Sequence, residues 1–135
     1  MIERKAVIDY IKREKRFSGI ERELKIQHIK GKITSIIGPR RSGKTFYLLY
    51  LLNSKYQKAL YLNFELFFLK NLSPSEFFEI IKLHNEIKGY TPRILLLDEI
   101  QEVQDWQSLL RTLLDYGYEI VVTGSSSKLL SREIA

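Results

Sequence analysis

The segment Gly38-Pro39-Arg40-Arg41-Ser42-Gly43-Lys44-Thr45 has the residue types and the spacing of a phosphate-binding loop. It matches the pattern G-x-x-x-x-G-K-[ST] at every fixed position. Glycines let the backbone turn tightly, so that successive N–H groups point inward and hold an anion. Lys44 would reach the β- and γ-phosphates of a nucleotide, and the Thr45 hydroxyl would bind Mg²⁺. The pattern therefore predicts a nucleotide site over residues 38–45. We include Phe46, the residue that follows the pattern, among the nucleotide-binding residues.

Two carboxylates, Asp98 and Glu99, follow the apolar run Ile94-Leu95-Leu96-Leu97. Taken alone, such a run is a strand end that meets solvent. The phosphate loop upstream favours the Walker B interpretation, in which Asp98 holds Mg²⁺ and Glu99 orients or deprotonates the attacking water. The chain also lacks the Asn-Lys-x-Asp motif with which G proteins read guanine. We therefore expect ATP, with catalytic roles for Lys44 and Glu99.

A third polar group ends the run Glu119–Thr123, in the sequence Thr123-Gly124-Ser125-Ser126-Ser127. If this strand lies between the other two, its hydroxyls end between Lys44 and Asp98. We expect a sensor of the γ-phosphate or of the water here, and we favour Ser125 over Thr123 as a catalytic residue. The alternative is a Ser-rich loop that caps a helix beginning near Lys128.

Four short β-branched or apolar runs alternate with helical patterns along the chain. The strands are expected at 33–37, 59–64, 93–98 and 119–124, and the helices at 44–52, 74–87 and 105–116. This alternation predicts an α/β fold with a parallel sheet covered by helices on both faces. Before the phosphate loop, residues 3–16 read as an amphipathic helix and residues 22–28 as a further strand.

Composition and charge exclude several classes of protein. The 135 residues include no Cys and 2 His, so disulfide scaffolds, thiol nucleophiles and Cys- or His-rich metal sites are not expected. No apolar run is long enough to span a membrane, and the N-terminus does not resemble a signal peptide, so we expect a cytoplasmic protein. Residues 1–45 carry 13 Lys or Arg against 5 Asp or Glu, which suits a polyanion such as ATP or nucleic acid but also a solvated helix face.

Together these motifs resemble the AAA class of P-loop ATPases, and in particular an archaeal and bacterial group. The resemblance covers about residues 22–135 and rests on five motifs: GPRRSGKT, YLNFE at 61–65, LLLDEIQ at 95–101, Trp106, and TGSSSKLLSREIA at 123–135. It implies a three-layer P-loop NTPase sandwich in which the sensor strand separates the Walker A and Walker B strands.

The resemblance also implies roles for single residues. Asn63 becomes the candidate glutamate-switch partner of Glu99, or else a strand-end Asn that caps a turn. Trp106 is expected to pack beneath the Walker B helix. Arg40 and Arg41 would contact phosphate or a neighbouring subunit, or remain solvated.

The same resemblance implies that the ATPase domain continues beyond Ala135 with a fifth strand, a lid and an arginine acting between subunits. We therefore expect an N-terminal basic helical segment at 1–20 and a truncated ATPase core at 21–135, with residues 33–37 at a sheet edge. Strand 22–28 could cover part of that edge.

Mg²⁺-dependent ATP binding and hydrolysis, driving a conformational change, is the leading functional hypothesis. Its candidate partners are a homo-oligomer of the full-length protein and nucleic acid, and no membrane is expected. Two alternatives stay open: a nucleotide-binding switch without turnover, and a DNA helicase or translocase fragment, since Asp98-Glu99-Ile100-Gln101 also reads as a D-E-x-Q box.

Overall fold

The computed structural model describes residues 2–13, 25–28, 33–39 and 43–124. Its strands are β1 (Lys25–His28), β2 (Ile33–Ile37), β3 (Leu60–Asn63), β4 (Ile94–Asp98) and β5 (Glu119–Gly124). Its helices are α1 (Arg4–Arg13), α2 (Lys44–Ser54), α3 (Pro74–Lys88) and α4 (Trp106–Asp115), with a 3₁₀ turn η1 (Ile100–Glu102) after β4.

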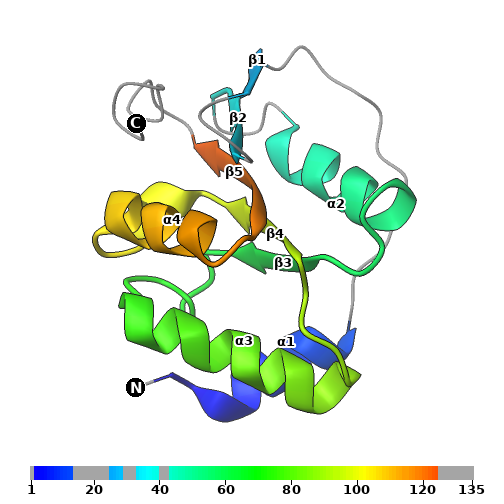
Figure 1. Cartoon of the computed structure of the whole chain (residues 1–135), viewed down its shortest axis with the longest axis vertical. Helices are drawn as coiled ribbons and strands as arrows, with labels where there is room; N and C mark the ends of the chain where they lie inside the picture. Colours follow the sequence, from blue (N-terminus) through cyan, green and yellow to red (C-terminus); the bar gives the residue numbers. More distant parts are fainter. Residues whose placement is uncertain (1, 14–24, 29–32, 40–42, 125–135) are drawn as a thin grey trace.

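The strands form one sheet in the order β1-β2-β5-β4-β3 (Figure 1). The four strands β2, β5, β4 and β3 are parallel, so the expected α/β fold of a P-loop NTPase is confirmed. The sensor strand β5 lies between β2, which precedes the phosphate loop, and the Walker B strand β4, as expected.

The expectation that residues 33–37 form a sheet edge was wrong, and the alternative, that a strand within residues 22–28 covers this edge, is confirmed. Strand β1 pairs with β2 in antiparallel register, from Lys25 opposite Ile37 to His28 opposite Thr34. The backbone groups on that side of β2 therefore bond to β1. The short β1 becomes the edge strand at this side of the sheet instead, which limits the backbone surface that another chain could pair with.

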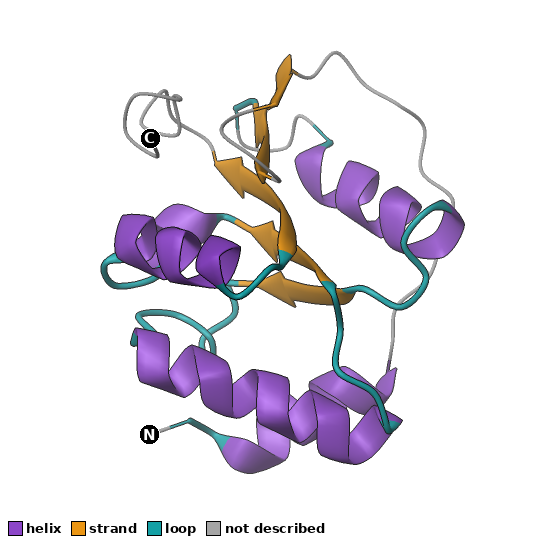
Figure 2. Ribbon diagram, viewed as in Figure 1, coloured by secondary structure: helices purple, strands orange, loops and turns teal. Residues whose placement is uncertain are grey.

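Helices cover both faces of the sheet, giving three layers (Figure 2). Alternate residues of each strand face opposite layers. Leu95, Leu97, Ile120 and Val122 pack in the core beneath α1, α3 and α4, whereas Leu96 and Val121 pack beneath α2. The expected N-terminal helix is present as α1, whose Val7 and Ile11 are buried in the first of these cores.

Local sequence explains where α3 begins and ends. The Ser73 hydroxyl accepts the Glu76 N–H at 3.3 Å, and a Glu76 carboxylate oxygen accepts the Ser73 N–H at 3.0 Å, which forms a capping box. Gly89 ends the helix with φ 82°, a left-handed conformation that glycine adopts without strain. Across the described ranges, no helix is both long and apolar enough to cross a membrane.

Candidate functional site

The phosphate loop joins β2 to α2, where it stands at the carboxyl ends of the parallel strands. Gly38 donates its N–H to the Gly124 carbonyl of β5 at 3.4 Å, which ties the loop to the sensor strand. Gly43 precedes α2 with φ 99°, so a residue with a side chain would be strained there. Gly43 thus leads directly into the N-terminus of α2, and a helix N-terminus is a favourable place for an anion.

Lys44 is nearly buried at the start of α2, with 3% of its surface exposed. Its Nζ donates to the Gly38 carbonyl oxygen and lies 3.1 Å from Glu99 Oε2. A buried ammonium is costly unless charged or polar groups surround it. The loop carbonyl and the Glu99 carboxylate provide these partners, and an incoming phosphate would compete with them.

Asp98 is completely buried at the end of β4, where three hydroxyl groups surround its carboxylate. Thr45 and Tyr61 donate to Oδ2 at 2.6 and 2.9 Å, and Thr123 donates to Oδ1 at 2.6 Å. These donors come from α2, β3 and β5, the elements that surround β4 on the α2 side. Both carboxylate oxygens are therefore held in a fixed orientation.

Glu99 follows in a left-handed conformation, with φ 57° and ψ 56°. This conformation is rare for a residue other than glycine, and it turns the chain sharply at the end of β4. The Glu99 N–H donates to the Thr123 hydroxyl at 2.9 Å, which supports the turn. The Glu99 side chain accepts from Gln101 Nε2 at 2.7 Å, so Lys44 and Gln101 together hold its carboxylate.

Tyr61 lies on β3, beside Leu96 of the Walker B strand in the sheet register. Burial, and then the negative charge of Asp98, raise the pKa of the Tyr61 hydroxyl well above its ordinary value. The hydroxyl therefore remains protonated and acts as a donor to Asp98.

The donor set at the site fits Mg²⁺. Thr45 and Asp98 bring a hydroxyl and a carboxylate oxygen to within 2.6 Å of each other, and both are hard oxygen donors. Within the described residues, no group of three or more His, Asp or Glu is placed to hold a metal ion. Magnesium commonly needs only one or two protein oxygens, because water and phosphate supply the rest.

A family model described as an AAA domain matches residues 30–135, most of the chain. The chain belongs to the AAA domain family. An AAA domain implies nucleotide binding and suggests ATP hydrolysis, in agreement with the residues gathered around Lys44 and Asp98.

This AAA domain is similar to two curated proteins, both uncharacterized. One, from Methanocaldococcus jannaschii, is 40% identical over 130 residues, and the other, from Haemophilus influenzae, is 34% identical over 110 residues. These matches cover 96% and 76% of this chain but only 29% and 28% of the relatives. The chain thus spans less than a third of the length of either relative. No solved structure matches the AAA domain significantly.

The structure brings together most of the predicted site residues that it describes. Lys44, Thr45, Asp98 and Glu99 meet at the carboxyl edge of the sheet. Phe46 follows Thr45 directly in the sequence, but 51% of its surface is exposed. Trp106 is buried in the core beneath the sheet, as expected for a packing residue. Four predicted residues lie outside the described part of the AAA domain: Arg40, Arg41, Ser42 and Ser125.

Asn63 ends β3 directly beside Asp98 in the sheet register. Its Oδ1 accepts the Glu65 N–H at 3.0 Å, so Asn63 caps the turn after β3. The carboxylate of Glu99 instead bonds to Lys44 and Gln101. A switch contact between Asn63 and Glu99 stays a prediction for another state of the AAA domain.

Three polar contacts at the site were not predicted from the sequence. They involve Tyr61, Gln101 and the bond of Thr123 to the Walker B residues. Strand alternation could have pointed to Tyr61, because it lies two residues before the polar end of β3. Gln101 stood in a recognised motif, but nothing local indicated that it would turn back toward Glu99.

Proposed function

We propose that this domain binds ATP with Mg²⁺ and hydrolyses it, and that hydrolysis drives a conformational change in a longer protein. The supporting observation is the meeting of Lys44, Thr45, Asp98 and Glu99 at one edge of a parallel sheet. Ligands in open α/β sheets bind at this carboxyl edge. These four residue types can bind phosphate, hold a metal ion and activate water.

Each residue has a distinct part in this proposal. The Lys44 ammonium moves from the Gly38 carbonyl and the Glu99 carboxylate to the β- and γ-phosphates, whose negative charge it offsets. When the Lys44 ammonium moves away, one carboxylate oxygen of Glu99 becomes available. Glu99 can then orient the attacking water and accept its proton. Thr123 keeps the Walker B turn in place by bonding to Asp98 and to the Glu99 N–H. Thr45 and Asp98 would hold Mg²⁺, which would supply positive charge close to the phosphate oxygens.

A switch that binds ATP without turnover is the second candidate. The ion pair between Glu99 and Lys44 and the bond from Gln101 favour it, because they keep the candidate base engaged. A persistent contact of this kind would leave no carboxylate oxygen available to the water.

The experiment titrates the chain with ATP and Mg²⁺ by calorimetry and then measures phosphate release, with and without duplex DNA. Binding with release supports an ATPase, and stimulation by DNA would favour the helicase or translocase alternative. Binding without release supports the switch. No ATP binding would refute the proposal. Because the relatives are about three times as long, the same assays on a full-length homologue would test nucleic acid as a partner, and the mass of that homologue in solution would test for a homo-oligomer.

A further inference from the structure

Among the described residues, three hydroxyl groups donate to Asp98, and the one on β3 belongs to Tyr61. It comes from the middle of β3 and reaches Asp98 Oδ2 at 2.9 Å from the side of α2. Thr123 holds the other oxygen, Oδ1, at 2.6 Å. Tyr61 and Thr123 therefore fix the two carboxylate oxygens from neighbouring strands on opposite sides of β4.

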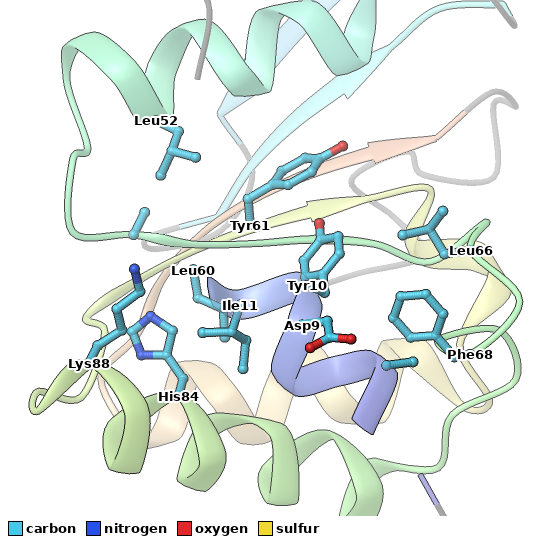
Figure 3. A pocket seen from close by; sticks show the side chains of 12 residues that line it. Asp9, Tyr10, Ile11, Leu52, Leu60, Tyr61, Leu66, Phe68, His84 and Lys88 are labelled. Carbon is cyan, nitrogen blue, oxygen red and sulfur yellow. The ribbon is translucent and has the colours of Figure 1, made fainter. Parts of the chain in front are cut away.

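Tyr61 is itself in contact with the N-terminal helix. The ring of Tyr10, from α1, stacks on the ring of Tyr61 with centroids 6.5 Å apart and planes 21° apart. Figure 3 shows the Tyr10 ring rising from α1 with its hydroxyl directed toward β3, and the Tyr61 ring extending from the other side of the β3 ribbon. The Tyr61 hydroxyl points away from α1, toward the site.

A cavity of about 320 Å³ lies beside these rings, between α1, β3 and α3. Both Tyr10 and Tyr61 line it, together with apolar side chains such as Leu60 and Phe68 (Figure 3). Open space therefore adjoins the Tyr61 ring. The stacked Tyr10 ring limits its movement into that space, because aromatic pairs of this geometry attract each other.

We propose that Tyr61 is a positioning residue that orients the Asp98 carboxylate for Mg²⁺, and that Tyr10 braces it from α1. The inference rests on the proposed function and adds a link between the N-terminal helix and the metal site. Groups that hydrogen-bond to a metal-binding carboxylate fix its orientation, and their loss commonly weakens metal binding by about 10- to 100-fold. Tyr61 has this relationship to Asp98.

The test measures the dissociation constant of a fluorescent ATP analogue in EDTA and in Mg²⁺. The ratio of the two constants reports the contribution of the metal. Tyr61→Phe removes the hydroxyl and keeps the ring, so we expect the Mg²⁺ enhancement to fall about 10-fold while affinity in EDTA is unchanged. A merely structural role would alter both constants alike.

Tyr56→Phe is the matched control. The Tyr56 hydroxyl also donates to a carboxylate, Glu119 Oε2 at 3.1 Å, but Glu119 begins β5 at the opposite end of the sheet from the site. This variant should keep the full Mg²⁺ enhancement. Thermal unfolding of both variants checks that they are folded.

Tyr10→Leu tests the brace from a separate element. It removes the stacked ring but leaves the Tyr61 hydroxyl, and we expect an intermediate loss of about threefold in the Mg²⁺ enhancement. Tyr50→Leu is its control, because Tyr50 also takes part in a stacked ring pair, with Tyr47 of the same helix α2 at 6.3 Å.

The outcomes separate the two proposals. Suppose that Mg²⁺ increases the ATP affinity of the native chain and increases that of Tyr61→Phe by the same factor. Only the positioning role is then overturned. An equal loss for Tyr61→Phe in EDTA and in Mg²⁺ also overturns it. If the native chain binds no ATP at all, the proposed function fails and this inference falls with it.

Discussion

Lys44 Nζ lies 3.1 Å from Glu99 Oε2, and the two side chains are only 3% and 7% exposed. The predicted phosphate-binding cation and the predicted catalytic base thus form a buried ion pair. Removing one partner of such a pair leaves a buried charge without compensation. Variants at the two positions should therefore behave very differently, although both disrupt the same contact.

Lys44→Ala should abolish ATP binding. The substitution removes the cation that would bind the phosphates and leaves Glu99 as a negative charge close to them. A hydrogen bond to a charged group contributes about 1.5–3 kcal/mol, so we expect affinity to fall at least about 10- to 100-fold. Calorimetric titration with ATP and Mg²⁺ measures the change. Lys82→Ala, an exposed lysine on α3, is the control, and unchanged affinity in Lys44→Ala would refute the phosphate-loop assignment.

Glu99→Gln should keep ATP binding and stop hydrolysis. The amide still fits beside Gln101 but cannot accept a proton from water, and general-base catalysis commonly contributes about 10²–10⁴-fold in rate. Phosphate release under saturating ATP measures this loss. Glu102→Gln, in the 3₁₀ turn η1 that follows Glu99, should retain the native rate. Native turnover by Glu99→Gln would mean that another group activates the water.

Thr123→Val should destabilise the fold more than Thr123→Ser. Valine has the shape of threonine but no hydroxyl, so Asp98 Oδ1 loses a donor and the buried Glu99 N–H loses its acceptor. Leaving such groups unsatisfied costs about 1–3 kcal/mol each. Urea unfolding of the two variants, followed by fluorescence of the single, buried Trp106, gives the comparison. A valine variant as stable as the serine variant would contradict a structural role for the hydroxyl.

Ser73→Ala should lower the free energy of unfolding by about 1 kcal/mol, because it removes the N-cap of α3. The substitution leaves the Glu76 N–H without its capping oxygen. The same urea titration reports the change. Ser108→Ala, inside α4, serves as the control and should stay within about 0.5 kcal/mol of the native chain. Equal stability of Ser73→Ala and the native chain would show that the cap adds little.

The parts of the site that could be predicted are those that the chain encodes locally. The phosphate loop is one continuous segment, and its glycines, Lys44 and Thr45 act on the same ligand through the backbone between them. Asp98 and Glu99 end a run of apolar residues, which marks the carboxyl end of a buried strand. The capping box of α3 is equally local, because Ser73 and Glu76 are three residues apart.

Other features depended on which strands became neighbours. Tyr61 and Thr123 reach Asp98 because β3 and β5 flank β4, and the side-chain alternation turns all three residues toward α2. The cover of β2 by β1 also required tertiary pairing, since four residues of strand carry little signal of their partner. The local spacing of residues does not indicate the bonds to Asp98 or the register of β1 on β2.

The sequence by itself determined the P-loop fold class and the four residues central to the proposed chemistry. Short motifs and apolar runs encode these features within continuous segments. Only the tertiary structure decided that Lys44 pairs with Glu99, that Gln101 turns back to the same carboxylate and that Tyr10 stacks on Tyr61. Two of these contacts join side chains that are distant along the chain, and the third depends on how the backbone turns after β4. Their geometry is fixed only when the helices pack on the sheet.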